Sequence, residues 1–431
     1  MASTRLTRTA SGGSNQIYTA SCWVKRTKLG TTTSVLTTGN GGADSNARML
    51  IFDATDKIEI AYYNAGFTYQ VTTNRLFRDT SAWYHLVVAV DTTQTTASDR
   101  IKIYVNGVQE TSFATSSYPS LNATFNYNSS AQYIGDLRGS GIYGEFLLSH
   151  FNYIDGLAYD ADTFGETDAT TGIWKPKTAP SVTYGTNGFF LKGENSGSLG
   201  TDSSGNANNF TVNGTPTQTV DTPSNVFATM NPLFAGDANI TYSNGNLKLT
   251  ATAEAQKNAV STIAVSSGKW YCEMVSRNGT NYPGFGIMDS QSVLQTSVLY
   301  LGSSSDSYCM FQDGNYYNNG SASSTGITWG VGSIMGIAID LDSATKTIKF
   351  YKDGAEVHSA TITTPANGYV FAASHNANGT ISEINFGNGY FGTTAVASAT
   401  TDESGLGIFE YDVPTGYYAL CTKNINEQEY S

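Results

Sequence analysis

Short runs of alternating apolar and polar residues, rich in Val, Ile, Thr, Tyr and Phe, recur along the chain between clusters of turn residues. Many of these reversals carry an Asn-Gly or Asp-Gly pair, which supplies the positive φ that a tight hairpin turn requires. The first residues of these pairs are Asn40, Asn106, Asn244, Asn278, Asp313, Asp353 and Asn378. A period of two residues, with hardly any helical period, predicts an all-β antiparallel fold.

The composition describes a globular chain with enough apolar residues for more than one core. The 431 residues are 39% hydrophobic and 12% aromatic, which is sufficient for two domains. The net charge of −12 comes without any basic block, so nucleic acid is not an expected partner. The longest apolar runs, at residues 86–90 and 334–339, are far shorter than the roughly 20 residues that span a bilayer, so membrane insertion is not expected.

Two features bear on the compartment in which the chain folds. Residues 1–20 are polar and rich in Thr and Ser, and they lack the apolar core of a secretory signal, which predicts folding in a cytoplasm. The cysteines at positions 22, 272, 309 and 421 lie far apart and form no C-x-x-C pair. We therefore expect them to be reduced and structural.

One three-strand pattern occurs twice. Strand-like runs at residues 83–91 and 101–105 lead to Asn106-Gly107, and runs at residues 333–340 and 347–351 lead to Asp353-Gly354. A repeated meander predicts two related β-sandwiches in tandem. We expect the first over residues 1–166, a connecting segment partly packed on it over 167–229, the second sandwich over 230–392, and a C-terminal segment with a strand pair, formed by residues 406–420, over 393–431.

Three motifs in the first half occur in an order that resembles a known family. They are S-C-W-V-K at residues 21–25, W-Y-H-L-V at 83–87 and Y-V-N-G at 104–107. With them, residues 4–165 resemble the laminin G-like, concanavalin A-like lectin/glucanase family. The resemblance implies a concanavalin A-like jelly roll, a fold in which calcium often binds at a loop rim.

The second half resembles another family. S-G-K-W-Y-C-E at residues 267–273, G-F-G-I at 284–287 and F-Y-K-D-G at 350–354 match motifs of the SPRY family. The resemblance covers about residues 230–392 and implies a SPRY-like sandwich.

Segments at the join and one near the C-terminal end resemble bacteriophage virion proteins, especially marine and cyanobacterial phage proteins that combine these two modules. The segments are residues 164–168, 172–176, 202–206 and 416–422. The resemblance implies a place in the virion, with assembly in the host cytoplasm without a signal peptide. It also implies other virion proteins as partners and several copies per particle, and it leaves a homo-oligomer open.

An enzyme is the remote alternative, because related sandwiches use paired carboxylates in an E-x-D-x-E strand. The nearest match is Glu166-Thr167-Asp168, but Thr170 stands where the third acid is needed. His85 lies in an apolar run beside Trp83, and His150 lies beside Phe151. His358 and His375 have no nearby Cys or Ser partner in a catalytic pattern, so we interpret all four histidines as structural. We predict no enzymatic activity and keep a glycan depolymerase as an alternative.

Calcium is the cofactor that the resemblance leaves open. The acidic candidates are Asp44, Asp53, Asp56, Asp99, Asp136 and Asp155. No D-x-D-x-D pattern groups them, and aspartates of turns or solvated surfaces explain them more simply. No cofactor is predicted and no metal ligand is assigned.

Aromatic and amide residues gather in the loops of both halves. Aromatic rings stack on the apolar faces of sugars, and amides and hydroxyls meet sugar hydroxyls. The predicted ligand-binding residues are Tyr62, Tyr63, Asn64, Phe67, Tyr69, Tyr282, Tyr316, Tyr317 and Asn318. The alternative is that these side chains cover the cores or contact neighbouring virion subunits.

The resemblance to phage proteins, taken with the absence of a catalytic pattern, implies a non-enzymatic phage virion structural protein. We expect a tail-associated fibre or adhesin that recognises a host-surface glycan or protein through many weak contacts from several copies. The alternative is a decoration or fibre protein on the capsid that binds other virion proteins.

Overall fold

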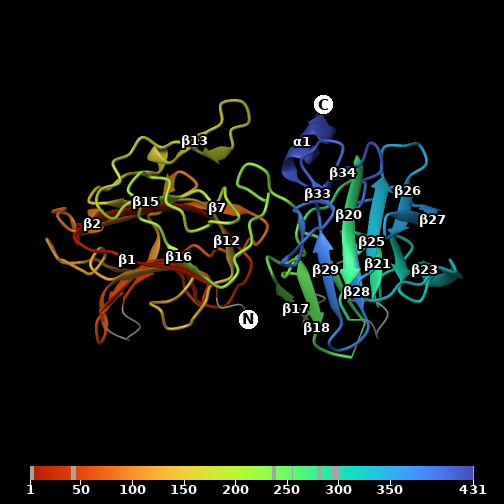
Figure 1. The fold of residues 1–431 in the computed structure, drawn as a ribbon, viewed down its shortest axis with the longest axis horizontal. Coiled ribbons are helices and arrows are strands. Elements are labelled where there is room, and N and C mark those ends of the chain that lie inside the picture. Colours follow the sequence, from red (N-terminus) through yellow and green to blue (C-terminus); the bar gives the residue numbers. More distant parts are fainter. Residues whose placement is uncertain are drawn as a thin grey trace. The chain divides into compact units, whose positions relative to one another are not determined.

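Figure 1 shows the computed structural model of the chain, which describes residues 4–39, 45–234, 239–254, 256–278, 283–292 and 300–430. In these ranges the chain forms β-strands, two short 3₁₀ turns and one α-helix, α1 (Thr422–Tyr430). It divides into two compact units, Met1–Gln218 and Thr219–Ser431. Each unit contains two large antiparallel sheets, which confirms the predicted all-β fold of two tandem sandwiches.

The first unit consists of an eight-stranded and a six-stranded sheet. The strands of the larger sheet are β1 (Arg5–Thr9), β3 (Thr33–Thr38), β4 (Asn46–Phe52), β5 (Ile58–Tyr63), β6 (Phe67–Thr73), β10 (Phe113–Ser117), β11 (Ala131–Ile134) and β16 (Thr211–Asn213). Those of the smaller sheet are β2 (Ile17–Arg26), β7 (Trp83–Asp91), β8 (Ile101–Val105), β9 (Val108–Gln109), β12 (Phe146–Asp155) and β15 (Phe189–Leu191). Their orders are β10-β6-β5-β4-β3-β11-β1-β16 and β15-β12-β2-β7-β8-β9.

Period-two alternation builds the core between these sheets. Alternate residues of β2, including Tyr18 and Val24, meet Met49 and Ile60 of the facing sheet in one buried cluster. The predicted meander is present, because β7 pairs with β8 and β8 with β9. Its tight turn places Asn106 at φ 49° and Gly107 at φ 85°, as a type I′ turn requires.

The segment after the first sandwich returns to it. β15 pairs with β12 and β16 with β1, so this segment adds an edge strand to each sheet. The carboxylate of Asp202 stabilises this returning segment, because it accepts hydrogen bonds from the backbone N–H groups of Phe190, Ser204 and Asn208. The segment at residues 202–206 therefore has a structural role in this unit.

A separate hairpin, β13 (Gly165–Thr167) and β14 (Trp174–Pro176), covers the outer face of the six-stranded sheet. The indole Nε1–H of Trp174 donates to Nδ1 of His85 at 2.9 Å, and the opposite ring nitrogen of His85 donates to Ser21 Oγ at 3.0 Å. Burial lowers the pKa of His85 to about 3, so the imidazole is neutral. His85 thus acts as a hydrogen-bonded packing residue.

The second unit also pairs a large sheet with a six-stranded one. The large sheet contains β17 (Ile240–Ser243), β18 (Lys248–Ala251), β20 (Lys269–Ser276), β25 (Ile334–Asp340), β26 (Thr347–Lys352), β27 (Ala355–Thr361), β29 (Ile381–Asn385) and β34 (Tyr418–Ala419). The other contains β19 (Lys257–Val260), β21 (Gly284–Asp289), β22 (Ser307–Phe311), β23 (Asn315–Asn318), β24 (Ser321–Ser324) and β28 (Tyr369–His375). The orders are β17-β18-β29-β20-β25-β26-β27, with β34 also beside β20, and β19-β28-β21-β22-β23-β24.

The core of this unit, like that of the first, is formed by side chains that the two sheets direct toward each other. Trp270 and Ile337 of the large sheet meet Phe285 and Phe371 of the smaller one. The second meander, β25-β26-β27, turns at Asp353 and Gly354, which have φ values of 49° and 84°. Both predicted meanders are therefore formed.

The C-terminal segment differs from the strand pair expected over residues 406–420. β33 (Ile408–Phe409) pairs with β32 (Thr400–Thr401), whereas β34 lies parallel to β20. A further short pair, β30 (Tyr390–Phe391) and β31 (Thr394–Ala395), precedes them. The apolar side chains of this segment are buried against the outer face of β20 and β25, so tertiary packing decides the pairing. Figure 1 shows β33 and β34 beside β20 within this unit, with α1 after β34 at the C-terminal end.

A buried carboxylate lies beneath the C-terminal segment. Glu273 of β20 is fully buried, and its oxygens accept the backbone N–H groups of Glu410 and Tyr411, both at 2.9 Å. The amide of Asn385 and the hydroxyl of Tyr271 donate over longer distances. Burial raises the pKa of Glu273 to about 7, although these donors act in the opposite direction.

This raised pKa predicts a pH-dependent stability of the second unit. Folded protein holds the Glu273 proton up to a pH near 7, and the unfolded chain loses it near the ordinary value of 4.5. As pH rises through this window, wild type should lose stability relative to Glu273→Gln, by at most about 1.4 kcal/mol per pH unit. Denaturant-dependent hydrogen exchange of the β20 amides would measure the free energy of unfolding of both proteins at each pH.

His375 changes the free energy of unfolding with pH in the opposite direction to Glu273. Wild type must therefore be compared with Glu273→Gln. Burial lowers the pKa of His375 to about 4, so its neutral ring adds stability as pH rises. This contribution is the same in both proteins and disappears from their difference. A difference in unfolding free energy that stays constant between pH 4.5 and 7 would contradict the assignment to Glu273.

Candidate functional site

The hairpin of β5 and β6 sorts the aromatic residues of the first half onto two faces. Tyr62 lies opposite Tyr69 in the register, and Tyr63 lies opposite Phe67. Tyr62 and Tyr63 are adjacent on β5 and point to opposite faces. The register shifts between the two pairs, so Phe67 shares the face of Tyr63 although it is only two residues from Tyr69. The first pair faces the core and the second faces outward.

The inward pair belongs to an aromatic cluster. Tyr69 is completely buried, and its hydroxyl lies 2.7 Å from that of Tyr127. The ring of Phe125 lies 5.0 Å from Tyr69 and 4.7 Å from Tyr62. A ligand on the surface cannot reach Tyr69, so this predicted contact residue is corrected to a core residue, with Tyr62 half-buried beside it.

The outward pair forms an accessible surface. Phe67 is 46% exposed, and its ring meets Tyr63 edge to face at 5.4 Å. The guanidinium of Arg48, held by an ion pair with Glu59, lies over the Phe67 ring at 5.2 Å. Asn64 is exposed at the turn. We call Arg48, Tyr63, Asn64 and Phe67 the hairpin surface.

The hairpin surface has the chemistry of a shallow polar–aromatic contact site. The two rings offer apolar faces, and the guanidinium and amide offer hydrogen-bond donors beside them. Such a mixture fits a hydroxyl-rich ligand that has apolar C–H faces. The sequence did not indicate Arg48, because its position over Phe67 depends on the pairing of β4 with β5.

In the second unit the predicted residues that the structure describes, Tyr316, Tyr317 and Asn318, do not form a comparable surface. The ring of Tyr316 packs 4.6 Å from His358, and that of Tyr317 packs 5.1 Å from Phe311 on the other face of β23. The amide of Asn318 donates to the carbonyls of Ser305 and Ser307 and so holds a turn. Tyr282 lies outside the described residues.

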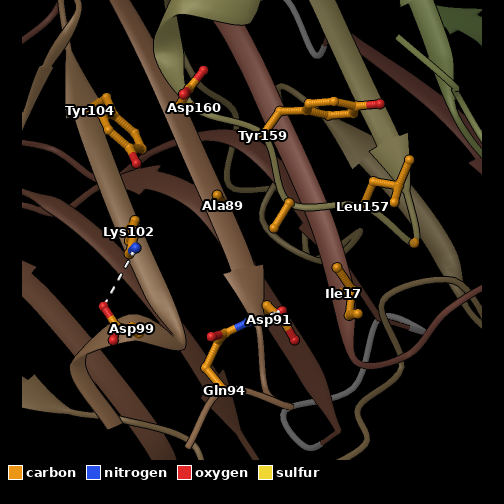
Figure 2. Close-up of a pocket in the computed structure, with 12 residues that line it drawn as sticks. Ile17, Ala89, Asp91, Gln94, Asp99, Lys102, Tyr104, Leu157, Tyr159 and Asp160 are labelled. Atoms are coloured by element: carbon orange, nitrogen blue, oxygen red, sulfur yellow. Dashed lines mark hydrogen bonds and ion pairs between the residues drawn. The ribbon is translucent and has the colours of Figure 1, made fainter. Parts of the chain in front are cut away.

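A second feature of the first unit is a concavity of about 410 Å³ on the outer face of the six-stranded sheet (Figure 2). Its floor contains Ala89, which points outward because Val88 and Val90 fill the core. Thr19 and Lys102 are the register neighbours of Ala89. The complete lining is Ile17, Ala89, Asp91, Gln94, Asp99, Lys102, Tyr104, Gly156, Leu157, Ala158, Tyr159 and Asp160.

Aromatic and charged groups surround this floor. Figure 2 shows Tyr104 and Tyr159 on opposite sides, with Asp160 between them. Asp99 and Lys102 form an ion pair at 3.5 Å, and Gln94 donates to Asp91 at 2.6 Å. The lining comes from three separate segments, so the sequence carried no local signal for it.

The acidic pair considered for catalysis lies on the exposed β13–β14 hairpin. Lys175 Nζ lies 2.9 Å from Asp168 and 3.6 Å from Glu166. The hydrogen bond from Lys175 holds the pKa of Asp168 well below its ordinary value. A general acid needs a raised pKa, so this arrangement does not fit that role.

The calcium candidates have other partners. Asp56 pairs with Arg26 and Arg78, Asp136 with Arg5, and Asp99 with Lys102. The remaining described candidates serve hydrogen bonds: Asp155 accepts from Asn128 and Asn187, and Asp53 from Thr55. Asp44 lies outside the described residues. In the described ranges, no three His, Cys, Asp or Glu side chains gather where a metal ion could bind.

In the part of the chain that the structure describes, the helix content includes no segment with the length and apolar character needed to cross a bilayer.

Two family models match the chain. Residues 3–157 match the concanavalin A-like lectin/glucanases superfamily, and residues 270–389 match the SPRY domain. The chain therefore contains a concanavalin A-like domain and a SPRY domain. No curated protein matches the sequence.

Solved structures with similarity to the chain include SPRY domains. The SPRY domain of human HERC1 is 19% identical with a TM-score of 0.30, and the match covers 36% of this chain and 96% of that chain. A second human SPRY domain is 19% identical with a TM-score of 0.28, covering 34% of this chain and 94% of that chain. The stonustoxin structure is 20% identical with a TM-score of 0.29, covering 37% of this chain and 26% of that chain.

The two faces of the β5–β6 hairpin predict different effects on stability. Tyr69→Ala should lower the free energy of unfolding of the first unit by about 3–5 kcal/mol, since it leaves a cavity in the aromatic cluster. Tyr63→Ala, on the outer face, should change it by no more than about 0.5 kcal/mol. Chemical denaturation of both variants tests this difference, and equal losses would contradict the assigned faces.

Proposed function

We propose that the chain is a non-enzymatic virion protein of a bacteriophage, a tail-associated fibre or adhesin that binds host-surface carbohydrate through the hairpin surface. The combination of a concanavalin A-like domain with a SPRY domain indicates a binding or adhesion module. The virion part of the proposal rests on the resemblance of the segments at residues 164–168, 172–176, 202–206 and 416–422 to phage structural proteins.

The observation that carries the proposal is the exposed Phe67 ring between Tyr63 and Arg48. A large aromatic ring that is 46% exposed leaves apolar area in water, and a ligand that covers it gains free energy. Sugar rings present C–H groups to such a face while their hydroxyls reach the neighbouring donors. The surface is shallow, so affinity for one copy should be weak and several copies on a particle should supply avidity.

The ion pairs of Glu166 and Asp168 with Lys175 support a role without catalysis. Glycoside hydrolysis uses one protonated and one ionised carboxyl flanking the bond. Here both acids share one ammonium group on an exposed hairpin. We therefore expect no release of reducing sugar from host polysaccharide, and an unchanged result for Glu166→Gln.

A second candidate function is a decoration or fibre protein of the capsid that binds other virion proteins. Two exposed apolar side chains favour it, Val108 at 65% and Ile173 at 56%. They flank Gly107 and Trp174, which lie in contact. An apolar surface of this kind suits a protein partner better than a sugar.

Binding of labelled full-length chain to host cells tests the primary proposal. Wild type should bind saturably, and enzymatic removal of surface glycans should abolish binding. The double variant Tyr63→Ala/Phe67→Ala should bind at least about tenfold more weakly, a loss of about 1.4 kcal/mol. Val108→Ala, which removes an exposed apolar side chain from the other sheet, is the matched control and should bind like wild type.

The same assay separates the alternatives. If the chain does not bind cells even on multivalent beads but binds emptied phage heads, and Val108→Asp/Ile173→Asp abolishes that binding, the capsid role is supported instead. Release of reducing ends by wild type would support a depolymerase.

A further inference from the structure

The concavity over Ala89 lies on the opposite side of the first sandwich from the hairpin surface. The hairpin surface is on the outer face of the eight-stranded sheet, and Ala89, Lys102 and Tyr104 are on the outer face of the six-stranded sheet. None of the residues predicted from the sequence to bind a ligand lines it.

We propose that this concavity is a second carbohydrate site, which takes one sugar unit without acidic groups. The ligand class rests on the proposed glycan recognition, but the site uses different residues. Its volume of about 410 Å³ lies in the range of small-ligand sites.

The hollow exists because Ala89 has a small side chain and lies just beyond the part of β7 that the segment after β12 covers. Val87, two positions earlier on β7, is buried beneath Ala161 and Phe164. The covering segment does not continue over Ala89, whose methyl group leaves room above the sheet between Tyr104 and Tyr159. The site is therefore shaped by rigid strands on its floor and by the segment 156–160 at its edge.

Two tyrosines form the walls. Both are half-buried, and backbone N–H of Thr183 donates to the Tyr159 hydroxyl at 3.4 Å, which helps to hold that ring. Rings on opposite sides of a hollow can contact both a sugar face and its edge. Burial, and then the charges of Asp160 and Asp162, raise the pKa of Tyr104, so its hydroxyl stays protonated as a donor.

Charge decides which sugars fit. The lining contains the carboxylates of Asp91, Asp99 and Asp160 against the single ammonium of Lys102, which already pairs with Asp99. Carboxylates accept strong hydrogen bonds from sugar hydroxyls or from a protonated amine. A uronic or sialic acid would bring a further negative charge into the same space and be repelled.

The test uses the full chain against immobilised oligomers of neutral hexoses, of glucosamine and of glucuronic acid. Wild type should bind at least one non-acidic oligomer and should not bind the glucuronic acid oligomer. Ala89→Trp fills the hollow and should weaken the non-acidic binding at least tenfold. Ala89→Ser keeps the hollow open and is the matched control.

Folding of Ala89→Trp is checked by circular dichroism and thermal unfolding. If it does not fold, Tyr104→Ala, which removes a wall without adding volume, replaces it and should cause the same loss. Undiminished binding by a folded variant, or a preference for the acidic oligomer, would overturn the proposal.

The two carbohydrate proposals can fail separately. Binding that is lost in Tyr63→Ala/Phe67→Ala but kept in Ala89→Trp overturns the concavity and leaves the proposed function standing. The reverse pattern supports the concavity and contradicts the role of the hairpin surface. Failure of wild type to bind any oligomer and any host cell contradicts both.

Discussion

Burial of both faces of the central strands is the constraint on which the rest of this structure depends. In each unit the central strands carry apolar side chains toward the core and also outward. In the first unit the outer residue Val87 is covered by Ala161 and Phe164, and in the second Tyr271 is covered by Phe409 and Tyr417. If these outward side chains stayed exposed to water, the fold would lack the stabilising free energy that their burial contributes.

This constraint explains why each sandwich is followed by a segment that returns to it. The two segments have short strands and many turns, and their backbones are held by buried carboxyl groups that accept hydrogen bonds from backbone N–H groups. Asp202 does this in the first unit, and Glu273 beneath the second segment does the same. Such contacts order irregular chain at positions where a long strand cannot form.

The sequence predicted the features of the fold that depend on neighbouring residues alone, namely the strands of the meanders and their tight turns. The period of two identified the meanders, and Asn106-Gly107 and Asp353-Gly354 identified their turns, because φ preferences are properties of the residue itself. The parallel pairing of Tyr418–Ala419 with β20 and the helix α1 were not predicted, since both depend on packing against distant segments.

The same distinction applies to the candidate sites. Composition identified the aromatic loop at residues 62–69, but the strand register decides that Tyr69 is buried and Phe67 exposed. Arg48 and the hollow over Ala89 could not be found locally, because they arise where separate strands meet. In the function that we propose, these surfaces act through repeated weak contacts from several copies in place of a deep pocket.

The most direct test of recognition without catalysis is equilibrium binding of the full chain to purified host-surface polysaccharide, with polymer length measured in the same sample. Saturable binding with unchanged polymer length is the predicted result. Absence of binding when the chain is presented in many copies, or a shortening of the polymer with time, would contradict it.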